Sequence, residues 1–347
     1  MYEARSYEEI LREMQDYSGN PAAKVEGTFE YDALSASAFE FAKVEVELEE
    51  GYNAAFADTS WGEYLTMRAK EHGVIRKEAT NAKATLAVTG TGTIPAGSIF
   101  ATVAGLRFAA DEETEITDAG IIEVTAVETG SDYNVAANAI TEIPMSIPGI
   151  TAVTNEEAAH DGYNEESDED LLTRYLMKVR MPATSGNRLH YIEWALSVTG
   201  VGSAKAISTW NGPGTVKVVI VDSNLHAASD ELVANVAAYI ETVKPAGGVD
   251  VTVVSAVETP VDITAKVYGV IDETAFAVAA HKYLQGLCRQ VFNVTKTQVT
   301  LTKIGSFILD AGNADDYADL KLNGAAENLI LTEEQMPSLG QVVFDVV

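Results

Sequence analysis

The sequence predicts an α+β multidomain protein with an N-terminal helical arm, a small all-β domain and two small two-layer α/β units. Three observations predict this fold class. Apolar residues at helical spacing and helix-capping residues dominate the first 80 positions. Short β-branched runs separated by Gly and Pro follow, and helical and strand patterns then alternate. We therefore place four domains, at residues 1–80, 81–158, 159–260 and 261–347.

The helical arm is expected to hold three helices, over residues 6–17, 32–52 and about 60–72. Pro21 ends the reach of the first helix, because proline cannot continue a helical hydrogen-bond ladder. At the third helix, Ser60 and Glu63 have the spacing of a capping box. Gly73 follows that helix and can take the left-handed conformation that closes a helix C-terminus.

A heptad pattern lies in the second helix of the arm. Leu34, Phe41 and Leu48 recur every seven residues, which is the spacing of a helix packed lengthwise on another helix. This seam packs either on the arm's own core or on another chain, and its three residues are the candidate interface. The run Val44–Leu48 also alternates like a strand, which competes with the helical pattern.

The all-β domain is predicted from four β-branched runs, at residues 85–89, 99–103, 106–109 and 121–127. Pro144 and Pro148 mark a linker to the next region. Gly92–Ser98 has the glycine spacing of a phosphate-binding loop, but it lacks the lysine that reaches the phosphates and it joins two strands. We exclude phosphate binding at this loop.

Residues 164–207 are expected to join the β-rich region to an α/β region. Ser167 is an N-cap candidate, and Asp170 completes a near-capping box and meets the positive end of the helix dipole. One apolar stripe then follows at helical spacing: Leu171, Leu172, Tyr175, Leu176 and Val179. A second helix restarts at Ser185–Asn187, with a buried face of Leu189, Ile192 and Leu196.

The connection between these two helices is a candidate hinge. Pro182 stops the first helix, and Gly186 lies just before the second. Positions of this kind absorb backbone rotation when two parts of a protein move. A plain tight connection is the alternative interpretation.

The two α/β units are read from alternating strand and helix patterns. The first has strands at 201–209, 215–221 and 249–254 and a helix at 231–243. The second has a strand at 261–270, helices at 274–291 and 301–309, and strand candidates at 319–322 and 341–346. The second unit could be a diverged copy of the first, although no residue-level repeat proves it.

Composition limits the function classes. Of 347 residues, 52 are Asp or Glu and 23 are Lys or Arg, giving a formal charge of −29, which argues against nucleic-acid binding. The single cysteine, Cys288, excludes an internal disulfide and is expected to be a buried thiol. The uncharged run 84–106 has membrane-spanning length, but its glycines and Pro95 indicate strands and turns. With no signal peptide pattern at the first residues, we expect a soluble cytoplasmic product and no membrane insertion.

The search for reactive groups predicts no catalytic, cofactor-binding or metal-binding residues. The five histidines lack metal-ligand spacing. His160 and Asp161 are the most reactive-looking pair, and we expect them in a solvated polar linker. The acidic run Glu165–Asp170 is interpreted as a solvated helix start, with a divalent cation as the alternative. Trp210 is either an exposed contact or a core anchor.

Several short motifs, in their order and spacing, carry a family resemblance. In the first half they are Ser60–Leu65, Gly73–Arg76, Gly90–Phe100, Leu106–Phe108, Val124–Ala126, Gly130, Asn134–Val135, Ile147–Ile150 and Val153–Asn155. The clearest follow: Gly162, Glu166–Glu169, Arg174, Pro182–Asn187, Tyr191, Trp194 and Gly200–Val201. Together they resemble the baseplate J-like family of contractile phage tails and phage-tail-like particles. The resemblance covers about residues 55–260 and, more loosely, both ends.

The resemblance implies a structural baseplate wedge component without catalytic residues. Such proteins associate in pairs around the tail hub, and neighbouring pairs join into a ring. They bind a small sheath-initiating wedge protein and a protein that connects to receptor-binding fibres. The ring holds the tail in its loaded state and rearranges for sheath contraction. The N-terminal helices would then pack into a bundle with partner chains, and the C-terminal units would supply ring contacts. The particle would be assembled in the bacterial host cytoplasm, as part of a virus or of a bacteriocin.

Two other functions stay open from the residues alone. One is a carbohydrate-binding adhesin that uses the β domain, although residues 82–154 hold only Phe100, Phe108 and Tyr133 as aromatic stacking groups. The other is a hydrolase with paired carboxylates between Asp161 and Asp170, although helix capping explains most of these acids.

Overall fold

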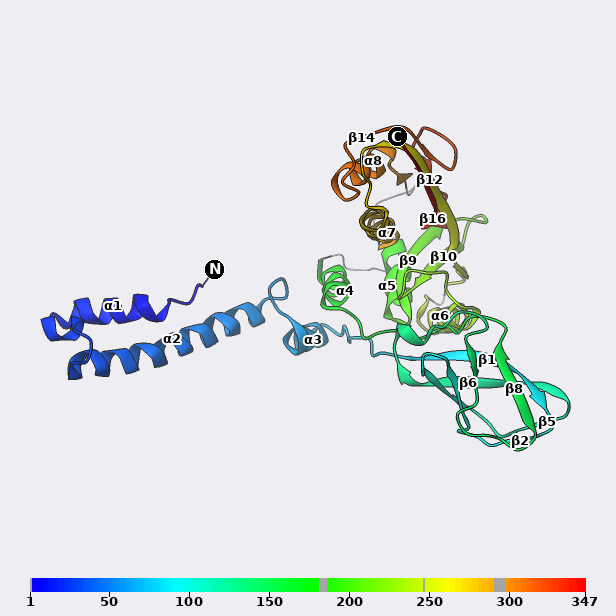
Figure 1. Ribbon diagram of the computed structural model, residues 1–347, viewed down its shortest axis with the longest axis horizontal. Helices are drawn as coiled ribbons and strands as arrows, with labels where there is room; N and C mark the ends of the chain where they lie inside the picture. Colours follow the sequence, from blue (N-terminus) through cyan, green and yellow to red (C-terminus); the bar gives the residue numbers. More distant parts are fainter. Residues whose placement is uncertain (1, 181–185, 246, 290–297) are drawn as a thin grey trace. The chain divides into compact units, whose positions relative to one another are not determined.

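A computed structural model describes residues 2–180, 186–245, 247–289 and 298–347 (Figure 1). The fold class is confirmed: N-terminal helices are followed by a nearly closed β barrel and two small α/β units. The chain divides into two compact units. The first joins the residues up to Arg76 with Ser167–Val179, and the second holds Lys77–Glu166 and Arg180–Val347.

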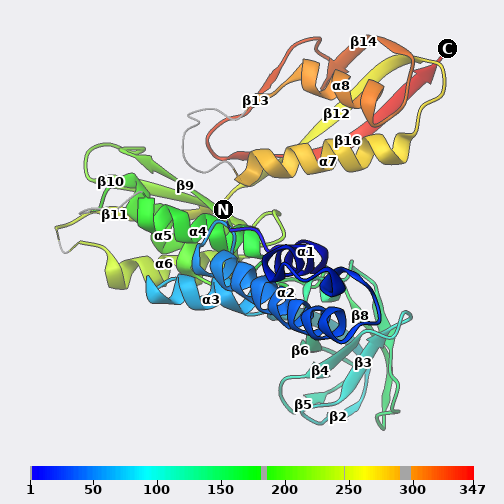
Figure 2. The same ribbon diagram turned by 90° about the vertical axis from the view of Figure 1, so that its left-hand side faces the viewer.

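The first unit is helical. It contains α1 (Tyr7–Ser18), the short 3-10 helix η1 (Pro21–Lys24), α2 (Phe29–Ala55), α3 (Gly62–Glu71) and α4 (Asp168–Arg180). Helices α1 and α2 lie side by side as a hairpin in both ribbon views (Figures 1 and 2). Ser6 and Glu9 form a capping box at α1, and Gly19 closes that helix with φ 65°. The run Val44–Leu48 is helical throughout, so the strand-like alternation does not determine its structure.

Helix α3 begins differently from the sequence prediction. Its N-cap is Trp61 and makes no side-chain cap bond, so the predicted capping box at Ser60 is wrong. Instead, the Asp168 carboxylate accepts a hydrogen bond from the Gly62 N–H at 2.8 Å. The same carboxylate forms an ion pair with Arg76 at 2.5 Å. A carboxylate from another helix thus satisfies an orphan donor at the start of α3.

Helix α4 packs on α3 rather than forming a simple joint between the β and α/β regions. Their shared core contains the buried residues Leu65, Ala69, Val74, Leu171 and Tyr175. Ser167 caps α4 as expected, because its hydroxyl accepts from the Asp170 N–H at 3.2 Å. The predicted apolar stripe is correct for its first residues, but Val179 at its end is 44% exposed.

The barrel lies at the start of the second unit. Its strands are β1 (Asn81–Gly90), β2 (Gly92–Ile94), β3 (Ile99–Thr102), β4 (Arg107–Ala110), β5 (Thr114–Ile116), β6 (Ala119–Thr129), β7 (Ile140–Glu142) and β8 (Ile150–Asn155), with the 3-10 turn η2 (Ser131–Tyr133). Six of them form one antiparallel sheet in the order β7-β3-β4-β6-β1-β8, and β2 pairs with β5. The sequence predicts β1, β3, β4 and β6, but it misses the four others, which are short or lie next to proline.

Asn155 brings the two edges of the barrel sheet together. Its side chain is fully buried, accepts from the Ile140 N–H at 2.8 Å, and donates to the carbonyls of Ala136 and Glu157 at 2.8 and 2.7 Å. A buried amide with all these bonds made is stable and fixes the local geometry. The end of β8 is thereby tied to the start of β7.

Two α/β parts follow the barrel in the same unit. The first contains α5 (Arg188–Ser197), β9 (Val201–Ser208), β10 (Thr215–Asp222), α6 (Asp230–Val243) and β11 (Asp250–Ser255). The second contains β12 (Val257–Tyr268), α7 (Glu273–Arg289), β13 (Gln298–Val299), α8 (Leu301–Asp310), β14 (Asp316–Leu322), β15 (Leu329–Ile330) and β16 (Gln335–Val346). Their main sheets have the orders β11-β10-β9 and β14-β12-β16.

These two sheets share a layout but not a connection order. In each, the central strand has one antiparallel and one parallel neighbour. The chain enters the first sheet at its antiparallel edge, β9, and the second at its central strand, β12. The shared layout alone does not establish that the second α/β part is a diverged copy of the first, which stays a hypothesis.

Strand β12 starts four residues earlier than predicted and passes through Pro260. Proline lacks an N–H and is therefore expected to break a central strand. The backbone nitrogen of Pro260 faces β14, and the pairing between β12 and β14 begins only at Ile263. On the same side the Asn323 side chain donates to the Pro260 carbonyl at 3.2 Å. No ladder bond is lost, and the proline is tolerated. The predicted last residues of the 274–291 helix lie outside the described residues.

Candidate assembly surfaces and the polar joint

The α1–α2 hairpin has a small buried core for its length. Ile10, Leu11 and Ala38 are buried, and five side chains pack partly against them: Tyr7, Met14, Tyr31, Leu34 and Ala42. Leu34, the first residue of the predicted seam, thus packs within the hairpin. The other two seam residues, Phe41 and Leu48, are each 55% exposed.

An exposed apolar stripe runs along α2. Phe41, Val44, Leu48 and Tyr52 follow one another at spacings of three and four residues, which places them on one face of the helix. We call these four residues the α2 stripe. The sequence prediction found Phe41 and Leu48 but missed Val44 and Tyr52, although the i, i+3, i+7, i+11 spacing was present. Large apolar side chains exposed in a row make this face a candidate contact surface.

A groove adjoins the α2 stripe. It has a volume of about 310 Å³ and is lined by Arg5, Ile10, Glu13, Met14, Tyr17 and Phe41. Tyr17 is 94% exposed at its rim. Because Phe41 belongs to both the groove and the stripe, the two surfaces are continuous. The hairpin therefore offers one continuous, mostly apolar face, with Arg5 and Glu13 among the residues that line its groove.

The surroundings of this face are acidic. Residues 1–56 hold 13 Asp and Glu against four Lys and Arg. One of the acids, Glu45, is held inside the hairpin, where its carboxylate accepts from the Arg5 backbone N–H at 2.9 Å and pairs with the Arg5 guanidinium. Hydrogen bonding to Arg5 lowers the pKa of Glu45. The remaining exposed acids give the apolar face a negative border.

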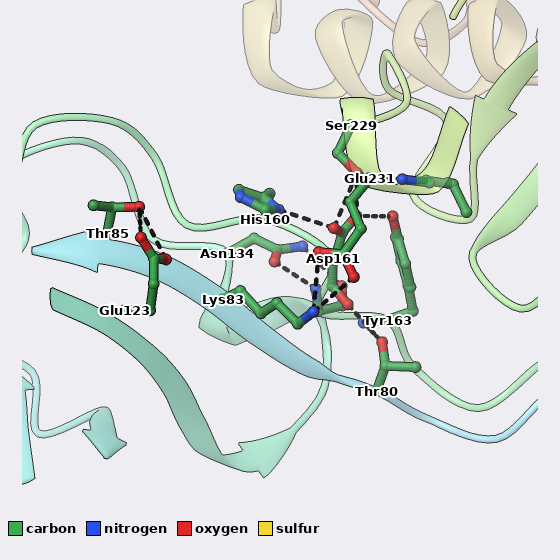
Figure 3. A network of polar contacts seen from close by, with 12 residues as sticks. Thr80, Lys83, Thr85, Glu123, Asn134, His160, Asp161, Tyr163, Ser229 and Glu231 are labelled. Atoms are coloured by element: carbon green, nitrogen blue, oxygen red, sulfur yellow. Dashed lines mark hydrogen bonds and ion pairs between the residues drawn. The ribbon is translucent and has the colours of Figure 1, made fainter. Parts of the chain in front are cut away.

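A polar network links the barrel to the first α/β part, within the second unit (Figure 3). Asp161 is its centre, with φ 62° and a side chain only 15% exposed. Its carboxylate accepts from the Tyr163 hydroxyl at 2.7 Å and from Ser229 Oγ at 2.9 Å, and it lies 2.9 Å from His160 Nδ1. The expectation of a solvated linker is therefore wrong for Asp161.

Two further residues, Thr80 and Lys83, add contacts to the same network. Thr80, just before β1, donates its hydroxyl to the Asp161 carbonyl at 2.6 Å and accepts from the Tyr163 N–H. Lys83 on β1 forms an ion pair with Glu231 on α6 at 2.7 Å. Thr80 and Ser229 are too far apart in sequence for spacing rules to connect them. We call this set of contacts, centred on Asp161, the polar joint.

Opposing effects set the protonation of the polar joint. Burial acts to raise the pKa of Asp161, but hydrogen bonds from His160, Tyr163 and Ser229 outweigh it and hold the pKa below its usual value. The hydrogen bond to Asp161 raises the pKa of His160. Nearby, burial raises the pKa of Asp222 to about 6. The Asp222 carboxylate accepts from the backbone N–H groups of Asn224 and His226 at 2.9 and 2.7 Å.

This arrangement positions backbone rather than activating a nucleophile. Ser229 donates to Asp161 and also accepts from the Leu232 N–H as the N-cap of α6. An activated serine would instead donate to a histidine base.

The acidic run Glu165–Asp170 does more than begin a solvated helix. Glu166 and Asp168 accept hydrogen bonds from backbone N–H groups at 3.1 and 2.8 Å. Within the described residues, no group of three or more His, Cys, Asp or Glu side chains could hold a metal ion.

The aromatic residues of the barrel are all interior. Phe100 and Phe108 are fully buried, and Tyr133 is 9% exposed. Residues 82–154 thus present no aromatic face for stacking on a sugar.

Outside the barrel, Trp210 is 40% exposed and Lys217 Nζ lies 3.9 Å from its ring centre, so Trp210 is a surface residue. Cys288 is buried as expected, and burial raises the pKa of its thiol to about 11.

Of the two candidate hinge residues, the structure describes Gly186 alone. Pro182 lies outside the described residues. Gly186 has φ 73°, and a Cβ there would stand 3.0 Å from the Pro245 ring, so glycine is needed at this position. Its N–H donates to His190 Nδ1 at 3.2 Å.

No helix in the described part of the chain is both long and apolar enough to cross a membrane.

Fold and surfaces together define a protein of N-terminal helices, a β barrel and small α/β units, with an exposed apolar stripe on α2. Comparisons with known proteins make this class specific. Residues 82–162 match the baseplate J-like protein barrel domain, and residues 183–255 match the baseplate J-like central domain. The chain belongs to the baseplate J-like family, whose members are structural baseplate components.

Relatives extend over the whole chain. The PBSX phage-like element protein XkdT of Bacillus subtilis (strain 168) is 34% identical over 99% of this chain and 98% of its own length. The uncharacterized protein YqbT of the same strain is 35% identical over the same shares. Baseplate protein gp47 of Escherichia phage Mu is 35% identical over 44% of each chain. A chain in the solved baseplate of the anti-feeding prophage aligns over 96% of this chain and 90% of its own length, with TM-score 0.41 and 12% identity.

Proposed function

We propose that this protein is a wedge component of the baseplate of a contractile injection system, either a phage tail or a phage-tail-like bacteriocin. In this role two copies associate within a wedge, wedges join into a ring around the hub, and the ring transmits the trigger for sheath contraction. Family membership supports the baseplate role. The single observation that carries the finer proposal is the exposed α2 stripe beside the hairpin groove.

The α2 stripe fits a helical partner. A 27-residue helix with one face packed on α1 and a neighbouring apolar face exposed is an incomplete bundle. A third helix in the groove would cover Phe41 and Leu48 and place its own flanking residues beside the acids of the hairpin. We therefore expect this helix to carry basic residues beside its apolar seam. A second copy of the hairpin alone would bring like charges together.

The small sheath-initiating wedge protein and the fibre-connecting baseplate protein are the proposed partners that supply such helices. The assembled particle is the proposed location, after assembly in the bacterial host cytoplasm. We assign no catalytic step, no cofactor and no nucleic-acid partner to the chain. Its formal charge of −29 opposes contact with a phosphate backbone.

The connection at residues 182–186 is the proposed hinge for the rearrangement on contraction. Its two candidate residues are Pro182 and Gly186, and the chain passes from the first compact unit to the second just before them, between Val179 and Arg180. Structures of loaded and contracted particles test this: we expect the angle between α4 and α5 to differ between the two states. An unchanged angle would assign the connection a purely static role.

A pair of matched double variants tests the bundle. Phe41→Ser with Leu48→Ser removes two of the four residues of the α2 stripe, whereas Glu40→Ser with Glu47→Ser changes exposed neighbours on the same helix. We expect the first variant to fold but to be missing from purified particles, which should then lack sheath, and the second to assemble normally. Circular dichroism of the free chains checks folding. Normal incorporation of the Phe41/Leu48 variant would contradict the proposed role of the stripe.

A further inference from the structure

The C-terminal sheet has one unprotected edge. Within the described residues, β16 pairs with β12 and with no other strand, so β16 is an edge strand along its whole length. Exposed edges present unpaired backbone groups, and monomeric proteins protect them with charges, prolines or bulges. The opposite edge, β14, is protected in this way, because it carries Asp316, Asp319 and Lys321 and a bulge with Asp319 at φ 54°.

The last part of β16 lacks such protection. Pro337 and Gly340 lie in its first half, and the register with β12 is regular from Val342 to Val346. Asp345 is its single charged residue. Val343 is 55% exposed on one face, while Val342 and Phe344 pack on the other face against the core beneath α7. In a chain with formal charge −29, a nearly neutral apolar edge is unusual.

The free backbone groups of this edge can be identified. The Val347 N–H donates to the Val267 carbonyl, and the Gln341 N–H donates to the Asp262 side chain, both on β12. Successive residues of a strand point their backbone groups to opposite sides. Val342, Phe344 and Val346 therefore direct their N–H and C=O groups to the open side.

We propose that this edge pairs with the same edge of a second copy, antiparallel about a two-fold axis through Val343. In that register Val342 lies opposite Phe344 of the second copy, in hydrogen-bonded pairs, and Val343 lies opposite its own equivalent. Gln341 lies opposite Asp345, so the two carboxylates do not face each other and each meets an amide. A register shifted to a Phe344 centre places Asp345 opposite Val343, which is less favourable.

The pairing extends each three-stranded sheet into a six-stranded one. Val342 and Phe344 already pack against the core on the helix side of the sheet, so the two cores become continuous. This inference rests on the proposed self-association within the baseplate and assigns one of its contacts to β16. Because the whole chains repel each other, added salt should strengthen the pair.

A disulfide test measures the geometry directly in the full-length chain. Val343 and its equivalent form a non-hydrogen-bonded pair with Cα atoms about 4.5 Å apart, a distance that a disulfide can span. Thr264, beside Val343 on the exposed face of β12, is the matched control, because its equivalents would lie about 14 Å apart across three strand spacings. Under mild oxidation we expect Val343→Cys to give several-fold more covalent dimer than Thr264→Cys. The wild type, whose Cys288 is buried, should give none.

A charge test measures the association itself. We expect Val343→Lys to abolish the dimer seen by sedimentation at high salt, because two lysines would face each other, and Thr264→Lys to preserve it. Equal crosslinking of the two cysteine variants, or a dimer that tolerates Val343→Lys, would overturn the pairing. A free chain that stays monomeric while Val343→Lys blocks incorporation into particles would also overturn it, in favour of a strand from another protein. Absence of the wild-type chain from particles would instead refute the baseplate role.

Discussion

The α1–α2 hairpin and the β barrel treat their large apolar side chains in opposite ways. The barrel buries Phe100, Phe108, Leu86, Ile94 and Ile140 completely. The hairpin exposes Phe29, Phe39, Phe41, Val44, Val46, Leu48 and Tyr52, and its buried core is Ile10, Leu11 and Ala38. The barrel closes its core within one chain, whereas most large apolar side chains of the hairpin are exposed to solvent in the single chain.

The difference separates folding from assembly. Burial of apolar surface stabilises a barrel by itself, and the polar groups of its closure are satisfied internally. A two-helix hairpin has few such contacts, so its own buried core contributes less to its stability, and a partner bound to its exposed face would add to it. Substitutions should therefore lower stability in the barrel and lower assembly in the hairpin.

The largest contrast is expected between two phenylalanines. Phe108→Ala empties space in the barrel core and should lower the free energy of unfolding by about 3–5 kcal/mol. Phe41→Ala, on the exposed face of α2, should change it by less than about 1 kcal/mol. Denaturant unfolding of the two free chains, followed by tyrosine and tryptophan fluorescence and by circular dichroism, gives both values. Similar losses in the two variants would remove the distinction between the regions.

The next largest change in stability is expected at Asn155, whose side chain closes the barrel. Asn155→Leu leaves the Ile140 N–H and the carbonyls of Ala136 and Glu157 without their buried partner, which should cost about 3 kcal/mol or more. Asn211→Leu, in an exposed turn, is the control and should stay within about 0.5 kcal/mol. Hydrogen exchange should show the loss of protection in β7 and β8 and none in α1 or α2. Unfolding of the hairpin in step with the barrel would show that the two regions are not independent.

The sequence predicts the regular parts of both regions because they depend on local patterns. Local spacing predicts the helix over residues 6–17 and the strand runs at 85–89 and 121–127, which correspond to α1, β1 and β6 within a few residues. The capping box of Ser6 with Glu9 is an equally local pattern that the prediction does not use. The short strands β2, β5 and β7 have no such pattern, because their pairing is imposed by residues far away in the chain. Asp168 capping α3 is of the same kind, since the cap comes from 106 residues away.

The candidate surfaces were predictable to different extents. Heptad spacing indicates Phe41 and Leu48, but spacing alone cannot tell that Leu34 faces α1 while the other two face outward. The polar joint depends on Asp161 and Ser229, 68 residues apart, and no sequence rule joins them. The β16 edge was predicted as a strand over 341–346, and its exposure depends on the order of strands in the sheet.

Asp222, beside the polar joint, predicts a pH effect in the second unit. In the folded chain burial raises its pKa to about 6, above the ordinary value of 3.8, so its contribution to stability is fully present below about pH 4 and is lost as pH rises through 6. The loss amounts to at most about 3 kcal/mol. Asp222→Asn keeps the acceptor for the Asn224 and His226 N–H groups, so it should flatten the stability curve between pH 4 and 6 and raise stability at pH 7. An unchanged curve would place the titration elsewhere.

The smallest effect tests how far surface charge ties the barrel to α6. The Lys83–Glu231 pair is about half exposed, so Glu231→Gln should lower stability by about 0.2–1 kcal/mol, and less at high salt. Asp230→Asn, one residue earlier in the first turn of α6, removes a similar helix-dipole interaction without this pair. The difference between the two variants, measured by thermal unfolding at low and high salt, isolates the ion pair. Equal losses would leave the buried hydrogen bonds of Asp161 as the contacts that hold the barrel to its neighbour.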